Sequence, residues 1–140
     1  MTFVRFAALA MAGAFLVGCG EEKVGCSEPA TIDALQNIVR NQIKSGQTAI
    51  MFDSEKTKIS VEAVRTRQST DRSASCAAKL NYDLAFNAEG GLDFMKAPAD
   101  KLKLIREEMN RQMATDITYE VERLDKEKGV YVTAKGLRSF

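Results

Sequence analysis

The first pattern that predicts an element is an apolar repeat between residues 28 and 45. Apolar residues recur there at spacings of three and four, on one helical face: Ile32, Leu35, Ile38, Val39 and Ile43. Ser27 supplies a capping hydroxyl, Glu28 an acid near the positive end of the helix dipole, and Pro29 a residue suited to the first turn. Gly46 ends the repeat. We therefore expect a helix over residues 28–45.

Alternation of apolar and polar residues predicts two strands after this helix. In residues 58–66 the apolar positions are Ile59, Val61 and Ala63. In residues 74–86 every second side chain from Cys76 onward is apolar: Cys76, Ala78, Leu80, Tyr82, Leu84 and Phe86. The polar segment 68–73 has no period, so we expect it to be a loop joining the two strands as an antiparallel hairpin.

The last third of the chain predicts a second helix and a terminal hairpin. Residues 99–113 follow a proline and carry one apolar stripe among many charges, which is typical of a solvated surface helix; the stripe is Leu102, Ile105 and Met109. The next strand is marked by alternating Ile117, Tyr119 and Val121. A polar turn at residues 125–129 and a second alternating segment at residues 130–135 complete the hairpin.

These elements predict the α+β class, with an N-terminal helix packed on an antiparallel sheet of about four strands. The order is helix-strand-strand-helix-strand-strand, which resembles the cystatin-like or NTF2-like arrangement of a leading helix wrapped by a sheet. That resemblance rests on element order and implies no function. Residues 26–140 are enough for one hydrophobic core, so we expect a single domain.

The first 19 residues have the features of a secretion signal. An apolar run from Phe6 to Val17 follows one basic residue, Arg5, and is shorter than the ~20 residues that a membrane-spanning helix needs. It ends in Leu16-Val17-Gly18-Cys19, which resembles the lipobox of bacterial lipoproteins. The open alternatives are an ordinary signal peptide that contains a cysteine, or a short buried helix.

The lipoprotein resemblance implies that residues 1–18 are a signal peptide that is removed. Diacylglycerol would be attached to the thiol of Cys19, and the new N-terminus would be acylated, so that several chains hold the protein on membrane lipid. Residues 19–25 would form a lipidated tether. Because Gly20, rather than an aspartate, follows the cysteine, we expect an outer-membrane location facing the periplasm if the host has two membranes.

The remaining two cysteines, Cys26 and Cys76, are expected to form a disulfide, because thiols outside the cytoplasm tend to be oxidised. Two buried free thiols are the alternative, and a metal site without histidine is less favoured. Because Cys76 lies on the apolar face of its predicted strand, the bond would join the start of the first helix to the sheet.

Charge and chemistry exclude several function classes. Loss of residues 1–18 removes one basic residue and leaves 19 basic and 19 acidic side chains, which disfavours nucleic acid as a partner. The chain has no histidine, so histidine-dependent nucleophilic catalysis and the usual zinc sites are excluded.

A carboxylate pair could still act as the acid and base of a glycosidase. Glu120 and Glu122 lie on the same face of a predicted strand, about 7 Å apart, but a solvated pair is the preferred interpretation. We expect no enzyme activity, metal or cofactor.

Three arginines around the first predicted loop, Arg65, Arg67 and Arg72, are the candidates for binding an acidic partner or phosphate. The alternative is a solubilising role. The leading hypothesis is a lipid-anchored envelope protein whose non-catalytic domain binds another envelope protein or assembly. The rival is a periplasmic inhibitor or binder of a cell-wall hydrolase such as lysozyme.

Overall fold

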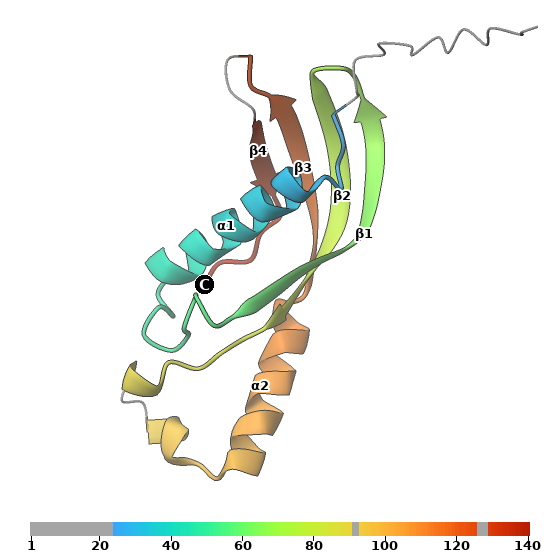
Figure 1. Ribbon diagram of the computed structural model, residues 1–140. Helices are drawn as coiled ribbons and strands as arrows, with labels where there is room; N and C mark the ends of the chain where they lie inside the picture. Colours follow the sequence, from blue (N-terminus) through green and yellow to red (C-terminus); the bar gives the residue numbers. More distant parts are fainter. Residues whose placement is uncertain (1–23, 91–92, 126–128) are drawn as a thin grey trace, which may run out of the picture.

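The computed structural model describes residues 24–90, 93–125 and 129–140. In chain order the elements are α1 (Pro29–Ser45), β1 (Lys58–Ser69), β2 (Ser73–Asp83), two short 3₁₀ helices (Ala88–Gly90 and Asp93–Lys96), α2 (Ala99–Met113), β3 (Thr115–Arg123) and β4 (Val130–Lys135). The strands form one antiparallel sheet in the order β1-β2-β3-β4, and α1 crosses one face of it (Figure 1). The predicted α+β class is confirmed.

Helix α1 packs on the sheet through a narrow stripe. Its fully buried side chains are Thr31, Leu35, Val39 and Ile43, spaced by four residues. Burial of each of the three aliphatic side chains contributes roughly 1.5–3 kcal/mol. The predicted cap was wrong, because the N-cap residue is Glu28 and no side chain makes a capping hydrogen bond; the Thr31 and Ile32 amides donate to the Glu28 carbonyl instead.

The core lies between α1 and the inner face of the sheet. Alternate residues of β2 and β3 point into it: Ala74, Cys76, Ala78, Leu80, Tyr82, Ile117, Tyr119 and Val121. The predicted disulfide between Cys26 and Cys76 is present, with the two Cα atoms 5.8 Å apart and both residues buried. The Tyr119 hydroxyl donates a buried hydrogen bond of 2.8 Å to the Cys26 carbonyl. The segment before α1 is therefore fixed to the sheet by a covalent bond and by hydrogen bonds, which include that of the Ser69 hydroxyl of β1 to the Val24 carbonyl (2.9 Å).

Strand β1 is longer than the alternation predicted. It continues to Ser69, so the turn to β2 comprises only residues 70–72 instead of the predicted loop 68–73. Two register irregularities interrupt its pairing with β2, one between Glu62 and Arg65 and one between Thr66 and Gln68. The bulged residue Ala63 has φ 50°, a left-handed conformation that is uncommon for residues other than glycine. These extra residues broke the period on which the prediction depended.

Strand β2 is shorter than predicted, ending at Asp83 rather than at residue 86. Its neighbour β1 begins opposite Asp83, so no strand is available to pair with the residues that follow. The Leu84 amide instead donates to the Asn110 side chain of α2 (2.9 Å), and the Ala85 amide donates to the Thr57 hydroxyl (3.1 Å). Chain direction after β2 is therefore set by contacts with α2 and with the α1–β1 connection.

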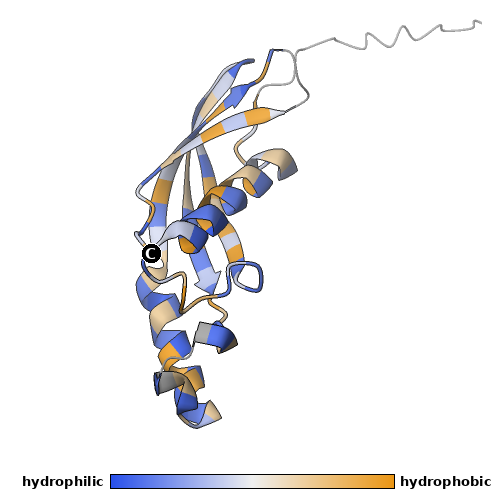
Figure 2. Ribbon diagram, turned by 90° about the vertical axis from the view of Figure 1, so that its left-hand side faces the viewer, coloured by the Kyte–Doolittle hydropathy of each residue, from blue (hydrophilic) through white to orange (hydrophobic). Residues whose placement is uncertain are grey.

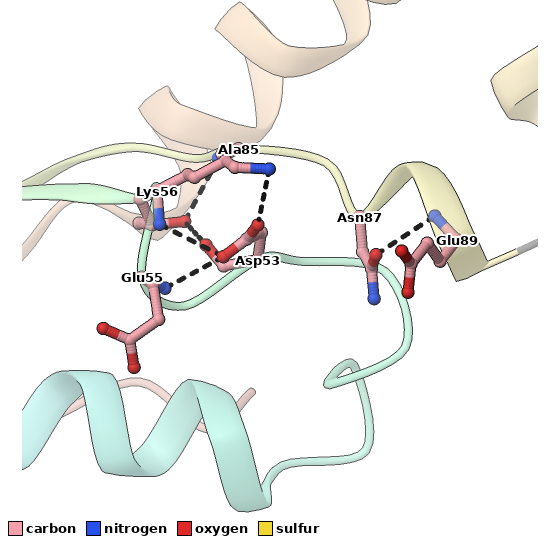
Figure 3. A network of polar contacts seen from close by, with 7 residues as sticks. Asp53, Glu55, Lys56, Ala85, Asn87 and Glu89 are labelled. Carbon is pink, nitrogen blue, oxygen red and sulfur yellow. Dashed lines mark hydrogen bonds and ion pairs between the residues drawn. The ribbon is translucent and has the colours of Figure 1, made fainter.

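A polar network joins the α1–β1 connection to the segment after β2 (Figure 3). The Asp53 amide donates to the Ala85 carbonyl (2.8 Å), and the Asp53 carboxylate accepts hydrogen bonds from the Glu55 and Lys56 amides (3.0 and 3.1 Å). These hydrogen bonds, with the Lys56 ammonium beside it, hold the pKa of the Asp53 carboxyl below its usual range. The network also contacts α1, because Lys44 of that helix pairs with Glu55 at 2.8 Å.

The two ends of the sheet differ. At the hairpin end, which we define as the β1–β2 turn (residues 70–72) and the end of β3, the Val24 amide donates to the Thr70 carbonyl (3.1 Å). At the opposite end α2 contacts mainly β2 and has no fully buried residue; Leu104 is 65 % exposed. Hydrophilic and hydrophobic residues are mixed along α2 (Figure 2). The predicted surface helix is confirmed, with the same bounds.

Candidate functional site

The outer face of the sheet, opposite α1, is not covered by either helix (Figures 1 and 2). Strand pairing places four residues in one row across it: Arg65 on β1, Ala77 on β2, Thr118 on β3 and Lys135 on β4. Adjacent strands lie about 4.8 Å apart, so the two cations of the row start from backbone positions about 14 Å apart. Two long basic side chains therefore flank two small ones.

This row is part of a depression of about 440 Å³, which we call the outer trough and define by Arg65, Arg67, Ala77, Thr118 and Lys135. Ala77 is only 9 % exposed although it faces outward, because neighbouring side chains rise above it. Arg67 is the extra residue of the second irregularity in β1, and the bulge directs it to the same face as Arg65. The bulge thus adds a second guanidinium to the β1 side of the trough.

The three cations of the outer trough, Arg65, Arg67 and Lys135, make no ion pair within the part of the chain that the structure describes. The nearest acids on β3 are Asp116, which also lines this depression, and Glu120; each is two residues from Thr118 and therefore about 7 Å from it along the strand. Elsewhere on the surface, basic residues do pair with acids, as Lys44 does with Glu55 at 2.8 Å. The trough cations are therefore available to an external anion.

The sequence grouped Arg72 with Arg65 and Arg67, and the structure places it apart. Arg72 lies in the β1–β2 turn, where its guanidinium is 3.4 Å from the Asp125 carboxylate and both side chains are about three-quarters exposed. It does not line the outer trough. Lys135 is instead the third cation of the outer trough. The sequence did not indicate it, because strand alternation shows the face on which a residue lies but not its partner across the sheet.

The carboxylates Glu120 and Glu122 line a separate depression of about 240 Å³ toward the hairpin end. Polar side chains such as Gln68 and Ser75 surround them, and both glutamates are exposed. Among residues 24–90, 93–125 and 129–140, no group of three or more His, Cys, Asp or Glu residues is arranged to hold a metal ion.

Two buried tyrosines have perturbed acidity. Burial raises the pKa of Tyr82 and of Tyr119 to about 12. Both point into the core rather than toward the outer trough. The Tyr119 hydroxyl has its hydrogen bond to Cys26, whereas the Tyr82 hydroxyl has no partner among the described residues. Their altered pKa values therefore bear on stability.

A second surface feature lies beside α2. A groove of about 380 Å³ is lined by Ala85, Phe86, Ala99, Leu102, Lys103 and Arg106. It is more apolar than the outer trough. Leu104 and Ile105, elsewhere on the same helix, are also exposed apolar side chains. One of its cations, Lys103, already lies 3.8 Å from Glu107.

The lipidation site predicted at Cys19 lies outside the described residues. Within those residues, no helix combines the length and apolar character needed to cross a membrane. Comparisons of the chain with protein-family models, with curated proteins and with solved structures gave no match. The candidate site accordingly depends on the geometry of the outer face.

Proposed function

We propose that this protein is a lipid-anchored component of the bacterial cell envelope, and that its domain binds another envelope protein or assembly without catalysing a reaction. The anchor is inferred from the resemblance of Leu16-Val17-Gly18-Cys19 to a lipobox. The binding role is inferred from the exposed outer trough and from the apolar surface of α2.

The observation that carries the proposal is the layout of the domain relative to the tether. Cys19 is five residues from Val24, so a fully extended tether reaches about 18 Å. Val24 is bonded to the β1–β2 turn, which would keep the hairpin end near the lipid. Strand β2 has 11 residues and a length of about 36 Å, and α2 follows its far end. The layout would leave the outer face and α2 accessible to a partner beyond the lipid surface.

The anchor is tested with Cys19→Ser in the full chain. The thiol accepts the diacylglycerol before the lipoprotein signal peptidase cuts, so the variant should accumulate as an uncleaved precursor without labelled fatty acid. Normal cleavage and membrane retention of the variant would refute the lipobox.

The binding role is tested by placing a photo-crosslinking amino acid at one exposed position at a time in living cells. Positions Thr133 beside the trough and Leu104 on α2 should yield a discrete adduct, and the exposed position Asn37 on α1 serves as the control. An envelope protein in the adduct supports the proposal, and a lysozyme-like enzyme supports the hydrolase-inhibitor alternative. Adducts no more frequent at Thr133 and Leu104 than at Asn37 would refute a binding role for these surfaces.

A further inference from the structure

We propose that the outer trough binds an extended acidic peptide segment of a partner protein, with Arg65 and Arg67 on one wall and Lys135 on the other. This inference rests on the proposed function and deepens it, because it names the chemistry that the partner must present. It makes no use of the lipid anchor and can be tested separately from it.

The width of the trough favours an extended chain over a helix. Its floor is formed by Ala77 and Thr118 on adjacent strands, about 4.8 Å apart, and its walls rise from backbone positions about 14 Å apart. A helix with its side chains is about 10–12 Å across and would displace the basic side chains from the space between the walls. An extended peptide leaves room for the cations to close on it from both sides.

The charge of the trough favours carboxylates. A guanidinium can bind a carboxylate through two parallel hydrogen bonds, and the two arginines lie next to each other on the β1 wall. Successive side chains of an extended peptide point in opposite directions. Two adjacent acidic residues would therefore direct one carboxylate to the arginines and the other to Lys135.

The two acids on β3 restrict where the ligand charge can lie. Asp116 and Glu120 are about 7 Å from Thr118 on either side along the strand, and they would repel carboxylates placed above them. Favourable binding is thus confined to a short acidic pair centred over Thr118. A long uniformly acidic tract would meet repulsion at both ends of the trough.

The probe is a capped hexapeptide, Ala-Ala-Glu-Glu-Ala-Ala, with Ala-Ala-Gln-Gln-Ala-Ala as its uncharged counterpart. Binding to the full chain in non-ionic detergent is followed by NMR shifts of ¹⁵N-labelled amides. We expect the acidic peptide to shift amides around Ala77 and Thr118 and to bind at least tenfold more tightly than the glutamine peptide. The affinity should fall as salt is raised, since the contacts are exposed.

Variants separate the trough from general surface charge. Exposed ion pairs contribute up to about a factor of five each, so Arg65→Ala with Arg67→Ala should weaken binding about tenfold. Arg72→Ala, matched in charge but located in the turn, should change it less than twofold. Thr118→Tyr fills the floor without a change of charge and should also weaken binding about tenfold. Thermal unfolding of each variant checks that the fold is intact.

Three results would overturn the inference. The first is equal affinity for the glutamic acid and glutamine peptides. The second is a loss in Arg72→Ala as large as that in the double arginine variant. The third is a response of the trough amides to micelles that contain phosphatidylglycerol with none to the acidic peptide, which would identify the ligand as lipid. None of these results depends on Cys19, so the lipid anchor is judged by its own experiment.

Discussion

Removal of the Cys26–Cys76 disulfide should weaken the domain without changing its fold. The bond joins residues 50 positions apart, and closing a loop of that length contributes roughly 4 kcal/mol by restricting the unfolded chain. The Tyr119 hydrogen bond to Cys26 and the Val24 hydrogen bond to Thr70 remain after the change. We therefore expect the double change Cys26→Ala and Cys76→Ala to lower the free energy of unfolding by about 2–5 kcal/mol.

The assay compares full chains that both carry Cys19→Ser, so that only the two disulfide cysteines of the three in the sequence differ between them. Urea unfolding in one non-ionic detergent is followed by far-ultraviolet circular dichroism. The native spectrum should be unchanged, the midpoint should fall, and the slope of the free energy with urea should rise because the unfolded chain expands. Labelling of denatured, unreduced Cys19→Ser protein should find no thiol, and reduction should reveal two.

Three results would refute this reasoning. Quantitative thiol labelling before reduction would show that the bond is absent and that the start of α1 is not joined to β2. A loss of the native spectrum in the double-alanine protein would show that the noncovalent contacts of α1 and the inner sheet face cannot specify the packing alone. A loss of stability below about 1 kcal/mol would indicate that the unfolded chain is compact even without the bond.

Three further predictions concern single positions. Tyr119→Phe should lower the free energy of unfolding by about 1–3 kcal/mol, because it leaves the buried Cys26 carbonyl without the hydroxyl that donates to it. The hydroxyl of Tyr82 has no partner among the described residues, so Tyr82→Phe should be neutral or stabilising in the same urea assay. Both tyrosines have a pKa of about 12 in the folded protein and about 10 in the unfolded chain. The free energy of unfolding should therefore be constant below pH 10 and fall by about 2–3 kcal/mol per tyrosine toward pH 12. Urea unfolding followed by circular dichroism checks this, and a flat pH profile would contradict the burial of the two hydroxyls. Gly136→Ala, at φ 84°, should cost about 1–2 kcal/mol in thermal unfolding, while Gly129→Ala, with its nearest neighbour 3.7 Å away, should change little.

The sequence predicted both helices well, α1 from its apolar repeat and α2 from the proline that precedes it. The helix expected over residues 28–45 is observed from Pro29, and the bounds of α2 match the prediction. Strand alternation failed at the ends of β1 and β2, where burial does not follow a simple period. Bulges interrupt β1. After β2 ends at Asp83, the next two amides donate to the Asn110 and Thr57 side chains instead of to a neighbouring strand. Such contacts link residues far apart in the chain and leave no local pattern.

The candidate site was only partly predictable for a related reason. Arg65 and Arg67 were recognisable as basic residues close together in the sequence. Their association with Lys135, 68 positions beyond Arg67, depends on the register of three strand pairs. Arg72 is nearer in sequence but lies in the turn with Asp125. Proximity along the chain therefore groups Arg72 with the two arginines, whereas sheet register groups Lys135 with them.

The position of the disulfide connects the proposed anchor to the fold. If Cys19 carries lipid, the covalent path from the membrane reaches Cys26 after seven residues and passes directly into β2 through Cys76. A load on the tether would then enter the sheet without unwinding α1, which begins only at Pro29. Reduction of the bond would leave the segment before α1 held by hydrogen bonds, those of Val24 with Ser69 and Thr70 and that of the Tyr119 hydroxyl with the Cys26 carbonyl. The same bond that stabilises the domain would thus keep its hairpin end in place on the tether while a partner binds the outer face.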